Sequence, residues 1–472
     1  VKHARKCMIR LQHDKRYAEL RQLYNELVKK EKMSKEEKSQ KKKLAKQLAA
    51  CRTEQGLSKA SLEHYLKVCG KQFSKLLSSQ QVQAEADRVW CGVERCLFGN
   101  GKELHFKKLM DFDTIGGKSN KNGARFDLDA MYVNWLGLSL KCYLPKSENS
   151  LSYVWESLKG KISYCNIKRL MFSSGWRYYA EIVVSGAAPT RVSIGTSTMG
   201  IDPGVSTIAG VSEDACVLEE LAPNAIQYEK KIQKISQSMD RSRRISNPNK
   251  YNEDGTIKRS NRDPWKHSKN YVKMCRLLKS LYRKKHAYIV DSHRKLCNKL
   301  ITIARYFPVE KMHFQALQKK TKEIRRQEKK TEVKQKDGTV KVIQKYKRKK
   351  RFGRSINRRA PARFLLELKR KAEAVGGVYA EVDTKEFKAS QYNHVTDTYE
   401  KIPLSQREKE IGNRKVQRDL YSAFLIRNAD LDFKHPDREK CEYEFEHFAN
   451  LQDQLILKMK ESGLSMRQCF GF

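Results

Sequence analysis

Three acidic residues stand where a chain could gather them for chemistry on phosphates. Asp202 follows a short apolar run in "TMGIDPGVSTIAG", Glu310 ends the run "YFPVE", and Asp419 lies at the start of the helical pattern "VQRDLYSAFLI". Carboxylates suit Mg²⁺, because this hard ion prefers oxygen ligands. Two Mg²⁺ ions about 3.5–4 Å apart can stabilise the attacking and the leaving oxygen of phosphodiester hydrolysis. The three acids are therefore candidate catalytic residues and metal ligands, for two Mg²⁺ ions with Mn²⁺ as a substitute.

Each acid, taken alone, also has a plainer explanation. The Asp-Pro-Gly at 202–204 is a common turn sequence, since each of its residues favours turns. Glu310 could be a surface acid, and Asp419 could be a helix-start residue favoured by the helix dipole. Asp383, which ends the run "VYAEVD", is a spare candidate if one of the three is misassigned. The metal hypothesis therefore needs a fold that joins acids 108 and 109 residues apart.

The hydrophobic pattern around these acids predicts such a fold. Strands, helices and turns alternate in the order strand, strand, strand, helix, strand, helix, strand, helix around a mixed sheet, which is the arrangement of an RNase H-like domain. In that arrangement the first and fourth strands are neighbours and a late helix packs across them. The predicted elements are a strand meander at 198–221, helices near 223–240 and 270–305, a strand ending at Glu310, a basic segment at 318–359 with an Asp-Gly hairpin signal, a helix at 360–375, the strand "VYAEVD", and a helix from about Val416.

Composition restricts the partners of this chain. Its 472 residues hold 98 lysines and arginines against 54 aspartates and glutamates, a formal charge of +44. Such an excess favours a polyanion, because released counterions drive basic proteins onto phosphate backbones. No apolar run of about 18 residues and no signal-like N-terminus is present, so no membrane partner is expected. The twelve cysteines include no Cys-x-x-Cys pair, which favours reduced thiols and disfavours a zinc site.

The first part of the chain has two contrasting patterns. Residues 1–110 read as basic helices, with a capping box from Ser34 to Glu37. Residues 111–195 are rich in aromatic and branched residues with partial alternation, which predicts a small antiparallel β-domain. We expect this domain to be a barrel completed by a strand near residues 3–10. The predicted class is therefore an α+β multidomain protein.

Three of these motifs resemble a known family. "GIDPGV", "VEKMHFQALQ" and "VQRDLYSAFLI" are similar to the three RuvC motifs of transposon-encoded TnpB proteins and the related type V CRISPR effectors. The resemblance covers residues 198–428 well, and the earlier part matches only in layout. It implies a helical recognition region at 1–110, a β-barrel wedge domain at 111–195, and a RuvC nuclease domain at 196–387 that is completed by helices at 416–472.

The resemblance also implies an activity. It points to an RNA-guided DNA endonuclease in the bacterial cytoplasm, located at the nucleoid when it is bound to DNA. Its partners would be a guide RNA, from a transposon end or a CRISPR array, and double-stranded target DNA. In this family the protein holds the RNA and the heteroduplex by their backbones, which suits a charge of +44.

One segment departs from the family. Members usually carry a four-cysteine zinc ribbon where this chain has residues 388–415. Here the segment "YNHVTDTYEKIPLSQREKEIGNRK" contains no cysteine and only one histidine, His394. A structural zinc site needs four ligands. We therefore expect a degenerate nucleic-acid-binding insertion that holds no zinc.

Rival interpretations remain open at this point. A shifted register would place Gln315 at the family's second acid and leave the nuclease silent, as in an RNA-guided DNA-binding repressor. Glu310 is preferred because it ends an apolar strand after Pro308, and because Leu317 then matches the leucine seven residues after the family's acid. An actin-like ATPase would need a second Asp-x-Gly phosphate loop, which is not evident. A strand-transfer transposase uses similar acids and is disfavoured by the family resemblance.

Overall fold

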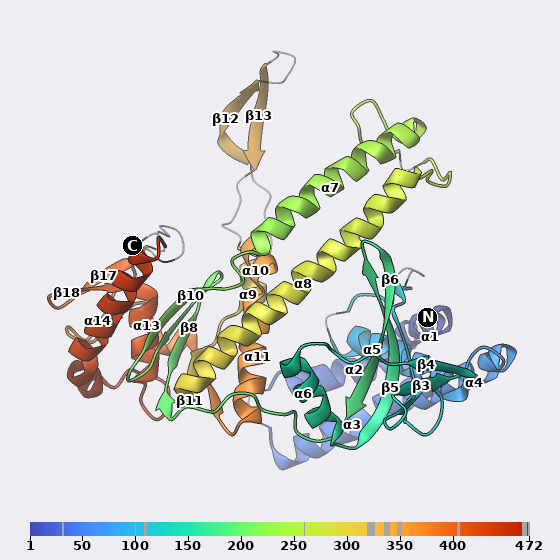
Figure 1. The fold of residues 1–472 in the computed structure, drawn as a ribbon, viewed down its shortest axis with the longest axis horizontal. Helices are drawn as coiled ribbons and strands as arrows, with labels where there is room; N and C mark the ends of the chain where they lie inside the picture. The colour runs from blue at the N-terminus through green and yellow to red at the C-terminus, as the bar shows by residue number, and fades with distance from the viewer. Residues whose placement is uncertain are drawn as a thin grey trace. The chain divides into compact units, whose positions relative to one another are not determined.

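The computed structural model describes residues 1–30, 33–99, 101–107, 111–258, 260–318, 326–334, 340–346, 352–403, 406–464 and 470. The chain divides into two compact units, Val1–Pro189 and Thr190–Phe472 (Figure 1). Within the described ranges, no helix combines the length and the apolar character needed to cross a membrane.

The first unit begins with helices, as the pattern predicts. Ser34 and Glu37 form the expected capping box, each bonding the other's backbone N–H. The prediction of a strand near residues 3–10 is wrong, because these residues belong to a helix. Ala4, Cys7 and Leu11 recur at helical spacing and are buried against Cys51 and Leu57, which a strand could not achieve. The helices are α1 (Lys2–Gln12), α2 (Lys15–Val28), α3 (Lys35–Glu54), α4 (Lys59–Gly70), the 3-10 turn η1 (Lys71–Phe73) and α5 (Ser79–Leu97).

The strands of the first unit form two small antiparallel sheets. One has the order β1-β5-β6 and the other β2-β3-β4, and both contribute to a core around Phe126, Val133 and Cys165. The antiparallel β-domain is confirmed, but without a strand from residues 3–10 the described part of the chain does not show the expected barrel closure. The elements are β1 (Thr114–Gly116), β2 (Arg125–Asp127), β3 (Tyr132–Trp135), β4 (Leu138–Lys141), α6 (Glu148–Leu158), β5 (Ile162–Phe172) and β6 (Gly175–Val184).

A mixed sheet of six strands forms the centre of the second unit. Its order is β10-β9-β8-β11-β14, with β7 also pairing with β11. Strand β9 is antiparallel to both of its neighbours, β8 and β10. Strands β8, β11 and β14 run parallel to one another. The predicted adjacency of the first and fourth strands is therefore observed between β8 and β11. The strands are β7 (Ser197–Thr198), β8 (Gly200–Pro203), β9 (Thr207–Val211), β10 (Cys216–Glu220), β11 (Ala304–Glu310) and β14 (Val378–Val382).

Helices cover both faces of this sheet. Side chains of α8 (Lys269–Ile303) and α11 (Pro361–Ala374) pack with Ile201, Phe307 and Val309 on one face. Helices α13 (Arg418–Arg427) and α14 (Arg438–Glu461) pack with Ala209, Val211 and Val382 on the other. Alternate residues of a strand point to opposite faces, so neighbouring residues of one strand belong to different cores. The sheet is a buried layer between two helical layers.

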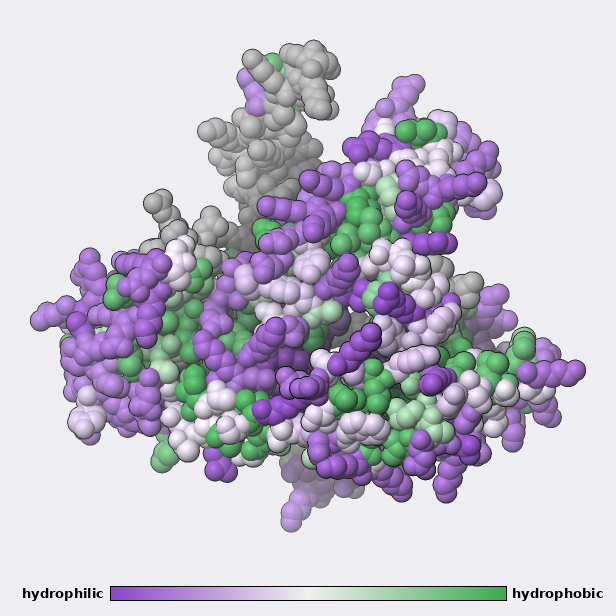
Figure 2. Space-filling view, viewed as in Figure 1, coloured by the Kyte–Doolittle hydropathy of each residue, from purple (hydrophilic) through white to green (hydrophobic). Residues whose placement is uncertain are grey.

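Two antiparallel elements extend from this core. Helix α7 (Ala225–Ser246) lies beside the long α8, and both carry hydrophilic surface in Figure 2. The basic segment after β11 contains α9 (Phe314–Gln318), the antiparallel pair β12 (Arg326–Lys334) and β13 (Val340–Tyr346), and α10 (Gly353–Arg359). The predicted hairpin is therefore present, while its Asp337–Gly338 turn lies outside the described residues. A short 3-10 turn, η3 (Pro248–Lys250), follows α7.

The segment between β14 and α13 folds as two small hairpins. After α12 (Thr384–Phe387), strands β15 (Tyr392–Asn393) and β16 (Thr398–Tyr399) form one pair, and β17 (Glu408–Ile411) and β18 (Arg414–Gln417) form the other. The helix expected from Val416 begins two residues later, because Val416 pairs with Lys409 in the hairpin. Gln417 then caps α13 by accepting a bond from the Leu420 N–H.

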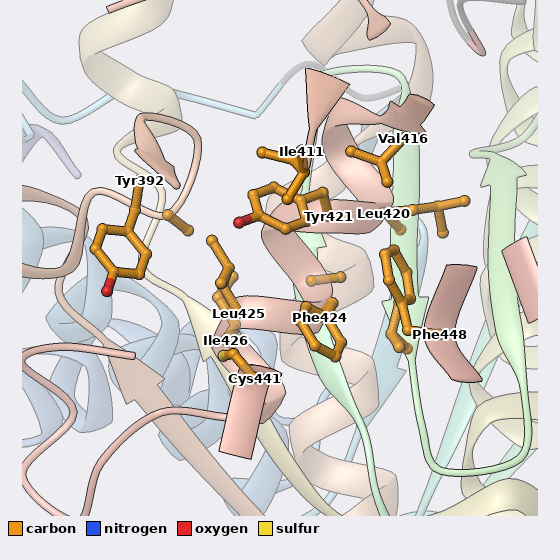
Figure 3. Close-up of a cluster of buried hydrophobic side chains, with 14 of the residues drawn as sticks. Tyr392, Ile411, Val416, Leu420, Tyr421, Phe424, Leu425, Ile426, Cys441 and Phe448 are labelled. Carbon is orange, nitrogen blue, oxygen red and sulfur yellow. The ribbon is translucent and has the colours of Figure 1, made fainter. Parts of the chain in front are cut away.

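Aromatic side chains join these hairpins to α13 and α14. Tyr392 and Ile411 from the hairpins pack with Tyr421, Phe424 and the rest of a shared core (Figure 3). The single histidine of the segment, His394, is 1% exposed and lies within this core. The segment is thus an integral layer of the second unit, built around hydrophobic side chains.

Candidate active site

Strand β8 aims Asp202 at the face of the sheet that α13 covers. Ile201 packs into the core shared with α8 and α11, so its neighbours Gly200 and Asp202 face the opposite side. The α13 backbone approaches closely there: a Cβ on Gly200 would lie 2.2 Å from the Ala423 carbonyl oxygen and 2.3 Å from the Arg427 nitrogen. Glycine at this position therefore allows the helix to lie against the strand that carries Asp202.

Glu310 ends the neighbouring parallel strand on the same face. Val309 pairs with Ile201 in the β11–β8 ladder, and both belong to the core under α8 and α11. Glu310 therefore points to the α13 side together with Asp202. Because parallel strands end at the same edge of a sheet, the two acids meet at the carboxyl ends of β8 and β11.

The two carboxyl groups lie close enough for each to shift the pKa of the other. Burial raises the pKa of Asp202 well above its usual value, and the charges of Glu310 and Asp419 and the bond to Glu310 add to that rise. Burial also raises the pKa of Glu310, opposed by the bonds from Asp202 and Thr384. Both raised pKa values favour a bound proton on this pair when no cation is present. Like-charge repulsion and desolvation would both be relieved by a cation.

Asp419 lies in the first turn of α13, beside the pair but bound to arginines. Its Oδ2 and Oδ1 accept bonds from Arg407 Nη1 at 3.1 and 3.3 Å, and its Oδ1 accepts another from Arg418 Nη2 at 3.3 Å. The Asp419 side chain is only 13% exposed. The structure thus brings all three predicted acids into one electrostatically coupled group, with the third carboxylate engaged by cations.

The group suits a hard divalent cation in its chemistry. Partly buried carboxylates at one edge of a sheet are a donor set that Mg²⁺ or Mn²⁺ could occupy. Across the part of the chain that is described, no three His, Cys, Asp or Glu side chains are already arranged to enclose a metal ion. The Asp419 carboxylate is instead bonded by Arg407 and Arg418.

Neighbouring elements hold the strand ends in place. After Asp202, the Gly204 N–H donates to the Thr207 carbonyl at 2.9 Å, which closes the turn between β8 and β9. The Ser355 hydroxyl of α10 donates to the Val205 carbonyl at 3.2 Å. Helix α10 is itself fixed by Arg358, whose guanidinium pairs with Glu229 of α7 at 2.8 Å. The loop beside Asp202 is therefore tied to the helices behind it.

The other sequence candidates have different roles. Asp383 is exposed and caps α12 by accepting a bond from the Lys385 N–H at 2.8 Å. Gln315 is exposed on α9 rather than in a loop, whereas the preceding Phe314 is buried. Of the two competing registers, the structure places Glu310, and not Gln315, beside Asp202.

Three residues near the acids were missed by sequence reasoning. Arg418 adjoins Asp419 in the quoted motif, so its closeness was visible, but its contact with the carboxylate was not. The Thr384 hydroxyl lies near enough to Glu310 to lower the pKa of that carboxyl, and it donates to the Lys311 carbonyl at 2.7 Å. Arg407 carried no local signal at all, because the β17–β18 hairpin that returns the chain to it is a tertiary feature.

Comparison with known proteins adds a likeness at low similarity. No protein-family model and no curated protein matches the sequence. The cryo-EM structure of the Cas12f1–sgRNA–target DNA complex is similar with a TM-score of 0.42 and 12% identity, covering 78% of this chain and 75% of that one. A CRISPR-Cas12f ternary complex is similar with a TM-score of 0.28 and 14% identity, covering 80% and 75%.

Proposed function

We propose that this chain is an RNA-guided DNA endonuclease of the TnpB or type V CRISPR effector kind, with an RNase H-like RuvC domain in its second unit. The observation that carries the nuclease is the partly buried pair of Asp202 and Glu310 at the edge of a mixed sheet, with the charge of Asp419 acting on both. The resemblance of the three motifs around these acids supports guidance by RNA. A formal charge of +44 supports binding to both nucleic acids.

Asp202, Glu310 and Asp419 would hold two Mg²⁺ ions, or Mn²⁺ in their place. When bound, these ions would activate a water and stabilise the leaving oxygen of the DNA phosphodiester. A bound cation would lower the raised pKa of Asp202 and favour its ionised form. Because the two strands belong to one hydrogen-bonded ladder, the backbone positions of both residues are fixed relative to each other. The Thr384 hydroxyl would hold the backbone that follows Glu310 through its bond to the Lys311 carbonyl.

The decisive experiment begins with the RNA that copurifies with the protein. Sequencing that RNA would identify a guide, and duplex DNA that matches the guide would serve as substrate in the presence of Mg²⁺. We expect guide-dependent cleavage that is lost on chelation and in Asp202→Ala, while RNA still copurifies. Cleavage that needs no RNA, or strand joining in place of hydrolysis, would contradict the proposal.

A silent RNA-guided repressor is the second candidate. It is favoured by one observation, the engagement of Asp419 by two arginines in place of a completed metal group. It predicts guide-dependent binding of the same duplex without cleavage at any Mg²⁺ or Mn²⁺ concentration. The cleavage assay therefore separates the two candidates.

A further inference from the structure

The Arg407 guanidinium contacts the Asp419 carboxylate, which is a candidate metal ligand. A metal ion would need the oxygens that the guanidinium now contacts. A single nitrogen of Arg407 contacts both oxygens of the carboxylate, at 3.1 and 3.3 Å. Both side chains are largely withdrawn from solvent, with 22% of Arg407 and 13% of Asp419 exposed. A bond of a guanidinium to a carboxylate is among the stronger hydrogen bonds in proteins, and partial burial reduces its screening.

The two arginines at this carboxylate differ in their exposure to solvent and in their position in the chain. Arg418 is next to Asp419 on α13, its side chain is 9% exposed, and its Nη1 also donates to the Gln406 carbonyl at 3.3 Å. Arg407 comes from the segment before β17, twelve residues away in the chain. It is the more exposed of the two, and its long side chain can change rotamer without moving α13.

The segment that presents Arg407 is firmly attached to α13. The Lys409 ammonium is 6% exposed, donates to the Tyr392 carbonyl at 2.7 Å, and lies 5.4 Å from the centre of the Tyr421 ring. The Arg418 N–H donates to the Arg407 carbonyl at 2.8 Å. These contacts fix the Arg407 backbone beside Asp419.

We propose that Arg407 is an autoinhibitory latch that competes with the divalent metal for Asp419. This inference rests on the proposed function and concerns the regulation of the same site. A metal ion on Asp419 would face a positive charge at the same oxygens, so the metal binds only when the guanidinium leaves. The role of the segment that lacks zinc ligands is thus to present Arg407. Its guanidinium keeps the metal from Asp419 until the guanidinium is displaced.

The test measures Mn²⁺ binding to the full-length chain, stripped of nucleic acid, by the electron paramagnetic resonance signal of free Mn²⁺. We expect Arg407→Gln to bind Mn²⁺ roughly tenfold more tightly than the wild type, which is the effect of one strong ion pair. Arg407→Lys should bind about two- to fivefold more tightly, on the order expected when the charge stays but a weakly hydrated guanidinium is replaced by a strongly hydrated ammonium. Arg414→Gln is the matched control, because Arg414 lies in the hairpin that follows Arg407 and pairs with Glu446 of α14.

A double-mutant cycle locates the effect. In an Asp419→Asn background, Arg407→Gln should leave Mn²⁺ affinity unchanged, because the competed ligand is gone. Equal or weaker Mn²⁺ binding by Arg407→Gln with a native circular dichroism spectrum would overturn the latch. If that variant does not fold, unchanged affinity in Arg407→Lys overturns it instead. Failure of the proposed metal site would give a different result. In that case Asp202→Ala would bind Mn²⁺ as tightly as the wild type does.

Discussion

Asp202 and Glu310 lie beside each other at the carboxyl ends of two neighbouring parallel strands. The strands β8 and β11 carry them to the same edge of the sheet, on the face that α13 covers. A pair of partly buried carboxyl groups is a costly arrangement without a cation, since both desolvation and mutual repulsion oppose ionisation. Removing either ionisable group should therefore change both stability and catalysis.

Asp202→Asn should abolish cleavage and stabilise the metal-free protein at neutral pH. The raised pKa of Asp202 means that the folded state holds this proton more tightly than the unfolded chain. The stability it provides is therefore complete below about pH 4 and is lost as pH rises through the folded pKa, by about 1.4 kcal/mol for each pH unit that separates the unfolded pKa from the folded one. Urea denaturation in EDTA should show a smaller loss between about pH 4 and 8 in the variant. Asp383→Asn, which keeps the α12 cap, should retain cleavage, and a wild-type rate in Asp202→Asn would refute the assignment.

Glu310→Gln should eliminate cleavage, whereas Gln315→Ala should not. The amide keeps the shape of Glu310 but cannot contribute negative charge toward two divalent cations. Gln315 is exposed on α9 and its truncation should leave the strand ends unchanged. The measurement is the rate of guide-dependent DNA cleavage under Mg²⁺. Normal cutting by Glu310→Gln would reopen the silent-repressor interpretation.

Gly200→Ala should disrupt the packing of α13 on β8. The new Cβ would meet backbone atoms at 2.2 and 2.3 Å, and backbone cannot give way as a side chain can. We expect a loss of about 3 kcal/mol or more in the free energy of unfolding, together with loss of cleavage. Gly210→Ala is the control, because its nearest neighbour is the flexible Met199 Sδ at 3.1 Å. Equal melting temperatures for the two variants would contradict this account.

His394 should make the second unit sensitive to acid. Burial lowers the pKa of His394 to about 4. Its Nδ1 lies 2.8 Å from the Tyr421 hydroxyl, which also accepts the His394 backbone N–H at 3.2 Å. The unfolded chain takes up the proton near about pH 6.5, so stability is complete above that pH and falls by about 3 kcal/mol as pH approaches 4. His394→Gln should flatten this dependence, whereas the exposed His435→Gln should keep it.

Zinc should be absent from the hairpin segment. We expect metal analysis of the purified protein to find less than one zinc per chain, and chelation to leave the melting temperature unchanged.

The segment is instead held by packing and by the Lys409 ammonium, so Lys409→Met should keep the fold but lose the bond to the Tyr392 carbonyl. A stoichiometric zinc would overturn this account and direct attention to cysteines elsewhere, such as Cys441.

Local patterns in the sequence predicted the strand meander, the long helices and the acids at the strand ends. Hydrophobic periodicity and turn residues act over a few positions, so Asp202, Glu310 and Asp419 could be singled out from their neighbours alone. The same local reasoning placed a strand at residues 3–10, where the spacing of Ala4, Cys7 and Leu11 forms a buried helical face. It also moved the start of α13 two residues too early, because pairing across a hairpin cannot be seen from one side of it.

Only the tertiary structure decided which groups meet. The pairing of β8 with β11 puts Asp202 against Glu310, although 108 residues separate them in the chain. The fold of the hairpin segment around Lys409 and Tyr421 brings Arg407 to Asp419, and no local pattern encodes that contact. Charge and residue type are properties of the sequence, but a shifted pKa or an ion pair depends on distance and burial, which arise only when distant segments pack.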